Sequence, residues 1–277
     1  MTVNLYQSLT TTSGVAGFIT IAGAKPPLVL ITGYTGTLFH WNKSFISELA
    51  KVYRVYLLDN RKVGISDSHN EASIAGMAQD LLDFIVAAKI EKPILLGWSM
   101  GGMIVQEFCK HHQHLIQGMC LISSVANANA ANKDFYDFIL DKDSLSEQQV
   151  NNKLFYYLFA ESSDDKIETY FINNAISISN YPYRFTAQAD QFQANAYNLW
   201  GGMQQQDYNK IKCPVLLLWA NNDKVVPLHA QHHMLSSMTT AKLIAYATGG
   251  HFMFQQHSHK IARDIINFFN LKKINYV

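Results

Sequence analysis

The sequence contains few charged residues and no excess of either sign. Lys, Arg, Asp and Glu make up 16% of its 277 residues, against about a quarter in typical soluble proteins. With 22 basic and 21 acidic side chains, the net charge is +1. This balance gives no electrostatic reason to expect nucleic acid or an anionic membrane surface as a partner.

Long apolar runs, targeting signals and cysteine pairs are also missing. No apolar stretch approaches the roughly 20 residues that cross a bilayer, so we expect no membrane span. Residues 1–7 have neither the basic region nor the apolar core of a secretory signal peptide. The three cysteines, Cys109, Cys120 and Cys213, are far apart and lie in apolar segments. We expect them to be reduced core residues of a cytoplasmic protein.

Motifs for bound metals and nucleotides do not occur in the sequence. The 11 histidines include adjacent pairs, but no Cys or carboxylate accompanies these pairs at ligand spacing. Neither Gly-x-Gly-x-x-Gly after a strand nor a P-loop is found. We therefore expect no metal and no cofactor.

Apolar segments of two kinds alternate along the chain. Short runs rich in Val, Ile and Leu predict strands that are covered on both faces. Between them lie segments with helical spacing, such as residues 74–86, which Ser73 can cap. The pattern predicts an α/β fold with a mostly parallel central sheet and helices on both faces. The runs predicted as strands are residues 28–31, 55–58, 94–96, 119–122 and 215–219.

Two parts of the chain depart from this alternation. Residues 3–9 and 15–22 are predicted to be two strands joined around residues 11–14. Residues 125–206 are rich in Asn, Gln and aromatic residues and have helical spacing without a strand. We therefore divide the chain into a first core part (1–124), a helical cap (125–206) and a second core part (207–277).

The sequence Gly97-Trp98-Ser99-Met100-Gly101 follows one predicted strand and precedes a helix. This is the pattern Gly-x-Ser-x-Gly in a strand–turn–helix setting, where a sharp turn presents a serine hydroxyl at the carboxyl end of a sheet. The turn leaves room only for small neighbours, and the helix behind the serine supplies free N–H groups.

With this motif the sequence resembles the α/β-hydrolase fold family over nearly its whole length. The family order is nucleophile, acid and histidine. Asp223 stands four residues before Pro227 in a loop after a strand, as the family acid does. His251 follows a short predicted strand, residues 243–246, and lies in a Gly-His-Phe loop of the kind that carries the family histidine. The resemblance implies the catalytic residues Ser99, Asp223 and His251.

The chemistry requires these three residue types together. A serine hydroxyl is a weak nucleophile at neutral pH and needs an imidazole to accept its proton. The imidazole in turn needs a carboxylate that fixes its tautomer and stabilises its charged form. All three residues follow predicted strands, where the loops of a parallel sheet converge.

An oxyanion hole is expected beside the serine. One donor is the backbone N–H of Met100, and the other comes from the loop Thr32-Gly33-Tyr34-Thr35-Gly36, where Tyr34 holds the family's donor position. Thr32 stands where the family usually has His, which affects the support of the loop but not the backbone donor. We expect Gly33 and Trp98 to contact the substrate.

The predicted cap has a charge of its own. Residues 125–206 carry 10 acidic and 5 basic side chains, whereas the rest of the chain carries 11 and 17. Its apolar residues either form an acyl pocket or serve as the core of the cap itself, and the second is the more common role. These residues are Phe135, Phe138, Leu154, Phe155, Tyr157, Leu158, Phe159, Phe171 and Trp200.

The predicted function is a serine hydrolase that cleaves esters of small or medium acyl groups. Within the family, the sequence is most similar to small cytosolic carboxylesterases, including pimeloyl-carrier-protein methyl ester esterases. The acidic cap argues against an acidic acyl-carrier protein as partner, whereas Arg54, Arg61 and Lys62 keep this partner among the alternatives. The others are a lactonase, a cofactor-free perhydrolase and a non-enzymatic ligand-binding protein.

Overall fold

The computed structural model describes residues 4–21, 25–159, 175–182 and 186–274. Its strands are β1 Asn4–Leu5, β2 Gln7–Thr10, β3 Gly14–Ile21, β4 Pro27–Ile31, β5 Arg54–Leu58, β6 Asp67–Ser68, β7 Ile94–Trp98, β8 Gly118–Ile122, β9 Ile178–Ser179, β10 Val215–Ala220 and β11 Ala241–Tyr246. Its α-helices are α1 Lys43–Ala50, α2 Ile74–Ala87, α3 Met100–His112, α4 Lys133–Asp141, α5 Glu147–Phe159, α7 Ala187–Asn198, α8 Gln205–Lys210, α9 Leu228–Ser237, α10 Met253–Gln256 and α11 Ser258–Ile274. Short 3₁₀ helices are η1 Leu38–His40, η2 Gln113–Leu115, η3 Ala128–Ala130 and η4 Lys142–Ser144.

The described residues form a nine-stranded central sheet. Its order is β11-β10-β8-β7-β4-β5-β3-β2, with β6 paired to β3. All neighbours from β11 to β5 are parallel, whereas β3 pairs antiparallel with β5 and β2. The predicted α/β fold with a mostly parallel sheet is confirmed, as is the hairpin around residues 11–14.

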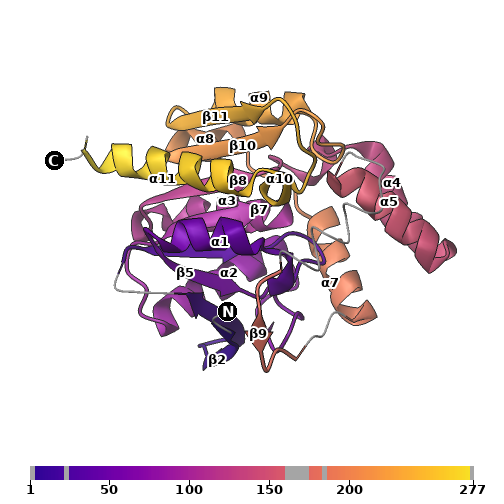
Figure 1. Ribbon diagram of the computed structural model, residues 1–277, viewed down its shortest axis with the longest axis horizontal. Helices are drawn as coiled ribbons and strands as arrows, with labels where there is room; N and C mark the ends of the chain where they lie inside the picture. Colours follow the sequence, from indigo (N-terminus) through magenta and orange to yellow (C-terminus); the bar gives the residue numbers. More distant parts are fainter. Residues whose placement is uncertain (1–3, 22–24, 160–174, 183–185, 275–277) are drawn as a thin grey trace.

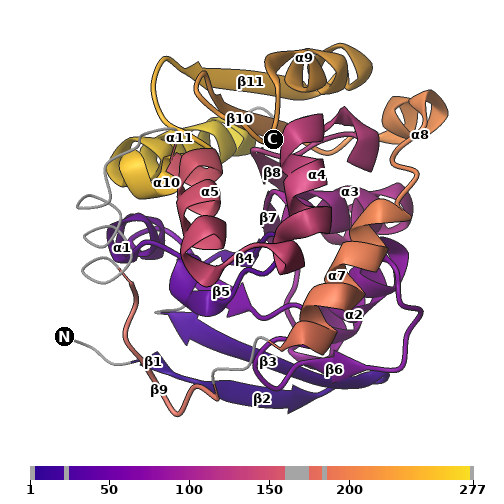
Figure 2. The same ribbon diagram turned by 90° about the vertical axis from the view of Figure 1, so that its right-hand side faces the viewer.

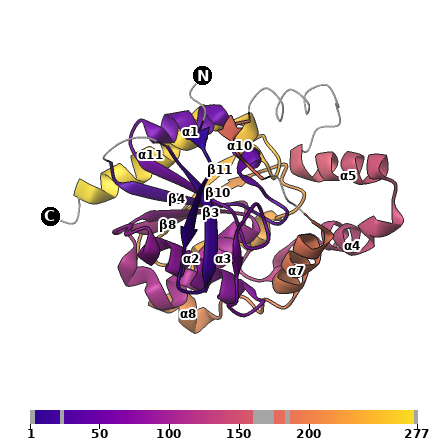
Figure 3. The same ribbon diagram turned by 90° about the horizontal axis from the view of Figure 1, so that it is seen from below.

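Helices cover both faces of this sheet, and strand side chains alternate between the faces. Leu28 and Leu30 of β4 belong to the core on the side of α1 and α11, whereas Val29 and Ile31 belong to the core under α2 and α3. Figure 3 shows the two helix layers on opposite sides of the strands. Burial on both faces explains why the strands are continuously apolar.

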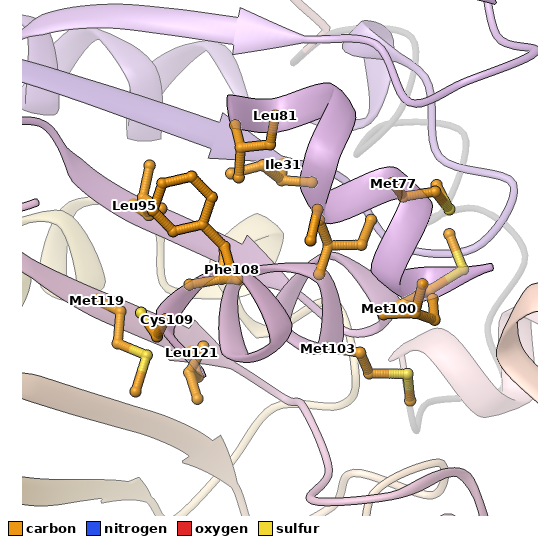
Figure 4. Packing of buried hydrophobic residues seen from close by; sticks show 14 of the residues in the cluster. Ile31, Met77, Leu81, Leu95, Met100, Met103, Phe108, Cys109, Met119 and Leu121 are labelled. Carbon is orange, nitrogen blue, oxygen red and sulfur yellow. The ribbon is translucent and has the colours of Figure 1, made fainter. Parts of the chain in front are cut away.

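The core beneath α2 and α3 holds the elements around Ser99 in place. Figure 4 shows Ile31 and Leu95 of the sheet near Leu81 and Phe108 of the helices, and each of these side chains is at most 1% exposed. Burial of one such side chain stabilises a fold by about 1.5–3 kcal/mol. This packing fixes β7 against α3, and therefore also the turn that joins them.

The chain between β8 and β10 forms α4, α5, β9, α7 and α8. Figures 1 and 2 show α4, α5 and α7 grouped at one side of the molecule, around the ends of β4, β7 and β8. The short strand β9 pairs with β1, with Asn4 opposite Ile178. The sequence pattern did not predict β9, because a strand of two residues has no periodicity to detect.

The three cysteines are free thiols. Cys109 and Cys120 are buried and Cys213 is partly buried, as expected of core residues. Although they are far apart in the sequence, Cys109 and Cys213 lie within hydrogen-bonding contact, and this contact and burial raise the pKa of the Cys109 thiol. No helix in the described part of the chain is long and apolar enough to cross a membrane.

A buried carboxylate ties the N-terminal segment to the sheet. Asp59, which directly follows β5, is 2% exposed. It accepts hydrogen bonds from the hydroxyls of Tyr6, at 2.8 Å, and Tyr181, at 3.0 Å. Tyr6 follows β1 and Tyr181 lies just beyond β9. Burial raises the pKa of Asp59 to about 7, although these hydrogen bonds favour the charged form.

This pKa predicts a pH-dependent stability. Because the pKa of Asp59 is higher in the folded chain than in the unfolded chain, the folded state binds the proton more tightly. The free energy of unfolding should therefore fall by roughly 1 kcal/mol per pH unit as the pH rises from about 5 to 7. Urea unfolding at several pH values measures this slope. Asp59→Asn should remove the contribution of the Asp59 carboxyl to the slope. An equal slope in both proteins would contradict the assignment.

Candidate active site

Ser99 lies in a strained turn between β7 and α3. Its backbone has φ +55° and ψ −123°, a conformation that non-glycine residues rarely adopt. The Ser99 N–H donates to the carbonyl of Ile122 at 2.9 Å. A Cβ on Gly97 would lie 2.4 Å from the Gly101 oxygen, and one on Gly101 would lie 2.3 Å from the Ile31 oxygen. The close approach of these backbones explains why both positions are glycine.

The loop after β4 passes directly against Ser99. A Cβ on Gly33 would lie 2.9 Å from the Ser99 Cβ and 3.1 Å from the ring of Trp98. The next residue, Tyr34, lines the same cavity as Ser99. On the other side, Met100 is the first residue of α3, and the first N–H groups of a helix have no acceptor within it. Both predicted oxyanion donors therefore belong to segments that adjoin Ser99.

Asp223 and His251 form a buried hydrogen-bonded pair. The distances from His251 Nδ1 to the two carboxylate oxygens of Asp223 are 3.0 and 3.1 Å. The Asp223 side chain is 0% exposed and the His251 side chain 3%. The backbone N–H groups of Val225 and Val226 also donate to Asp223 Oδ1, each at 2.9 Å. These donors hold the carboxylate in place, and the carboxylate orients the imidazole.

Trp98 contacts and stabilises the loop that carries His251. Its indole N–H donates to the carbonyl of His251 at 3.1 Å, and its ring stacks on Phe252 with 4.3 Å between centroids. The N–H of Phe252 donates to the carbonyl of Leu158, in α5, at 2.8 Å. Trp98 also lines the cavity. It therefore supports the loop of His251 in addition to its predicted contact with the substrate.

The structure brings Ser99 and His251 to the wall of one cavity, with Asp223 behind the imidazole. In the described part of the chain, no hydrogen bond joins the Ser99 hydroxyl to His251. Among the described residues, no group of three His, Cys, Asp or Glu side chains is placed to hold a metal ion.

The cavity has a volume of about 540 Å³, within the range of small-molecule sites. Most side chains on its wall are aromatic or aliphatic, and they come from the core and from α4, α5 and α7. Among the described lining residues, Lys142 and Asp190 are the charged Lys, Arg, Asp or Glu side chains. They form an ion pair with each other, so the wall carries no net charge from them.

The apolar residues of residues 125–206 take up three kinds of position, one more than the two roles considered above. Phe135, Leu154, Phe155 and Leu158 line the cavity. Tyr157 of α5 stacks on Phe138 of α4, as expected of a core within residues 125–206. Phe159 instead contacts Phe252 and Trp200 donates to Glu107, and both of these partners lie outside residues 125–206. Phe171 lies outside the described residues.

Several polar residues in or beside the cavity were not predicted from the sequence. Lys142 and Asp190 approach the hydroxyl of Tyr34, and Gln193 accepts a hydrogen bond from the N–H of Thr35. His40 also lines the cavity, and burial lowers its pKa to about 4. No local motif marks Lys142, Asp190 or Gln193, because each contacts the loop of Tyr34, more than 100 positions away in the sequence.

Comparisons with known proteins agree with this architecture. The sequence profile of the alpha/beta hydrolase fold family matches residues 26–258. An alpha/beta hydrolase fold protein from Chitinophaga pinensis has a similar structure, with a TM-score of 0.78 and 22% identity over 95% of this chain and 96% of that one. Naproxen esterase (carboxylesterase NP) from Bacillus subtilis gives a TM-score of 0.74 and 19% identity over 96% and 91% of the two chains.

A curated relative is similar over a shorter stretch. Pimeloyl-(acyl-carrier protein) methyl ester esterase from Edwardsiella ictaluri is 29% identical over 105 residues, which are 38% of this chain and 39% of the relative. The family profile, in contrast, extends from the start of the parallel sheet to the first residue of α11. The fold, the Ser99 turn and this match lead to one conclusion: the chain belongs to the α/β hydrolase fold family.

Proposed function

We propose that the protein is a serine hydrolase that cleaves uncharged carboxylic esters of small or medium acyl groups. In this proposal Ser99 is the nucleophile, His251 the general base and Asp223 the residue that orients the base. The observation that carries the proposal is the Asp223–His251 pair. Its carboxylate is fully buried, and its imidazole borders the cavity that also contains Ser99.

The reaction proceeds in two steps. The Ser99 oxygen attacks the ester carbonyl while His251 accepts the serine proton, and His251 then donates this proton to the departing alcohol. The acyl-Ser99 ester that results is attacked by a water molecule that His251 deprotonates. Cleavage of the acyl–Ser99 bond releases the carboxylic acid and restores the serine hydroxyl. The proposed reaction requires neither a metal nor a cofactor.

Backbone N–H groups stabilise the tetrahedral oxyanion. The proposed donors are the amides of Met100, at the start of α3, and Tyr34, in the loop that adjoins Ser99. Preorganised donors of this kind account for a large share of catalysis, since loss of one typically lowers turnover by about 10²–10³. The positive end of α3 adds to their effect.

The cavity wall supports an uncharged substrate. The aromatic and aliphatic lining favours an apolar acyl group. Lys142 is already paired with Asp190, so an acyl group with its own carboxylate would have to compete with Asp190 for the cation. A free carboxylate would therefore lose hydration without gaining an unpaired positive partner.

A carrier-protein methyl ester is a second candidate, because a relative with that name matches part of the chain. The 10 acidic and 5 basic side chains of residues 125–206 count against docking of an acidic carrier protein at the proposed cap. Lactones and peracids would use the same three residues. A non-enzymatic ligand-binding protein would not need the Asp223–His251 pair beside a serine.

A fluorophosphonate probe tests the nucleophile. The native chain should be labelled stoichiometrically at Ser99, because the probe phosphonylates an activated serine. Ser99→Ala should abolish the label while leaving the melting temperature close to that of the wild type. A folded wild-type chain that remains unlabelled would favour the ligand-binding alternative.

A panel of p-nitrophenyl esters tests the substrate class. The acetate, butyrate and octanoate should be hydrolysed, whereas the palmitate should be a poor substrate because the cavity is limited to about 540 Å³. The hemisuccinate is the matched charged control for the butyrate and should show a lower kcat/KM. Preference for the hemisuccinate would contradict the proposed uncharged substrate.

Asp223→Asn tests the orienting acid. The variant should retain the fold but lower kcat by about 10³–10⁴, since an amide holds the imidazole in the wrong tautomer. The measurement is kcat for p-nitrophenyl butyrate, together with thermal unfolding of both proteins. Asp207→Asn is a control at a buried carboxylate outside the cavity. If Asp223→Asn kept most of its activity, another group would have to orient His251.

A further inference from the structure

Two side chains of α7 hold the loop that carries the proposed oxyanion donor Tyr34. Gln193 Oε1 accepts a hydrogen bond from the backbone N–H of Thr35 at 2.8 Å. Asp190 accepts a hydrogen bond from the hydroxyl of Tyr34. Asp190 and Gln193 are three residues apart on α7 and therefore lie on the same face of the helix. One helix face thus contacts the loop at two successive residues.

The loop needs such support because its backbone is strained. Thr35 has φ +58°, a left-handed conformation that is unfavourable for a β-branched residue. Within the loop, the N–H of Gly36 donates to the carbonyl of Gly33, and the Thr32 hydroxyl donates to the carbonyl of Gly36, each at 3.0 Å. The Gln193 amide binds the N–H of the strained residue itself. That N–H belongs to the peptide group that joins Tyr34 to Thr35.

The Gln193 side chain is buried and does not lie at the protein surface. The residue is 0% exposed. Its Nε2 atom lies 3.5 Å from the carbonyl oxygen of Arg61, in the loop after β5. A buried amide is costly unless its polar atoms are bonded, so the two contacts hold the side chain in one orientation. The acceptor oxygen is therefore presented to Thr35 in a fixed place.

The side chain of Tyr34 is held in a similar way. Lys142 Nζ donates to the Tyr34 hydroxyl at 3.0 Å and lies 5.4 Å from the centre of the ring. Lys142 also pairs with Asp190, and the two side chains are only 20% and 21% exposed. The three groups come from the loop after β4, from η4 and from α7. The ring of Tyr34 is thus fixed to the chain that lies between β8 and β10.

We propose that Gln193 and Asp190 are positioning residues, which set the place of the Tyr34 N–H in the oxyanion hole. Gln193 fixes the peptide group that follows Tyr34, and Asp190 fixes its side chain. This inference rests on the proposed hydrolase function. It adds that two residues of α7 affect turnover by positioning the backbone of the loop after β4. Neither residue takes part in proton transfer.

The variant Gln193→Met tests the backbone contact. Methionine has similar length and no amide, so the Thr35 N–H loses its acceptor. We expect kcat for p-nitrophenyl butyrate to fall by roughly 10–100-fold, less than for complete loss of a donor, while KM changes by less than about threefold. Affinity for an alkyl trifluoromethyl ketone, whose adduct with Ser99 places an oxyanion in the hole, should fall by the same factor as kcat/KM. Gln191→Met, the same change at an exposed position of α7, should leave all three values near those of the wild type.

A double-mutant cycle tests the side-chain contact and does not depend on Gln193→Met being folded. Tyr34→Phe and Asp190→Asn should each lower kcat by about threefold to tenfold. Together they should lower it no further than the stronger single change, because both remove the same interaction. Asp137→Asn is the control, since it breaks the exposed ion pair with Lys133 on α4 and should leave kcat unchanged.

The outcomes separate this inference from the proposed function. A wild-type chain that hydrolyses esters, with a folded Gln193→Met that is equally active, would overturn the inference alone. Additive effects of Tyr34→Phe and Asp190→Asn would also overturn the proposed side-chain contact. A wild-type chain that neither reacts with fluorophosphonate nor hydrolyses esters would overturn the proposed function, and this inference with it.

Discussion

The close backbone approach between the β7–α3 turn and the end of β4 is the constraint on which the rest of the site depends. A single Cβ at Gly101 would lie 2.3 Å from the carbonyl oxygen of Ile31, so the two segments meet without intervening side chains. This contact places the loop after β4 against Ser99. It also orients α3 so that its first N–H groups face the serine. The continuous burial of β4 and β7 keeps these two segments in register.

Polar interactions hold the side chains and loops beside Ser99 in place. On the side of His251, polar contacts of the buried Asp223 fix the imidazole, and Trp98 fixes the backbone of its loop. On the side of Tyr34, α7 and η4 supply an amide and an ion pair. Hydrogen bonds have strict geometry, so they specify orientation where apolar packing alone would leave it loose. The apolar lining between these two polar groups is consistent with an uncharged ligand.

The helices of the proposed cap are hydrogen-bonded to loops of the core. Leu158 of α5 accepts a hydrogen bond from Phe252, directly after His251, and Asp190 of α7 binds Tyr34. Between α5 and α7 in the sequence lies β9, which pairs with β1, and Tyr181, just beyond β9, binds Asp59 beside the sheet. Movement of α5 would therefore displace the loop of His251, and movement of α7 the loop of Tyr34. In the proposed mechanism, these contacts link the shape of the cavity to the positions of the loops that hold Tyr34 and His251.

The sequence by itself determined the features that depend on local patterns. Continuous apolar runs marked the parallel strands, and the glycines around Ser99 marked a turn too tight for larger residues. The adjacency of Asp223 and His251 could also be predicted, since residues that follow parallel strands meet at one edge of the sheet. Only the tertiary structure decided which aromatic residues of residues 125–206 face the cavity, and that Gln193 and Asp190 reach the loop of Tyr34. These contacts join residues more than 150 positions apart, and no periodicity or motif encodes such pairs, because they arise only when the inserted helices pack on the sheet.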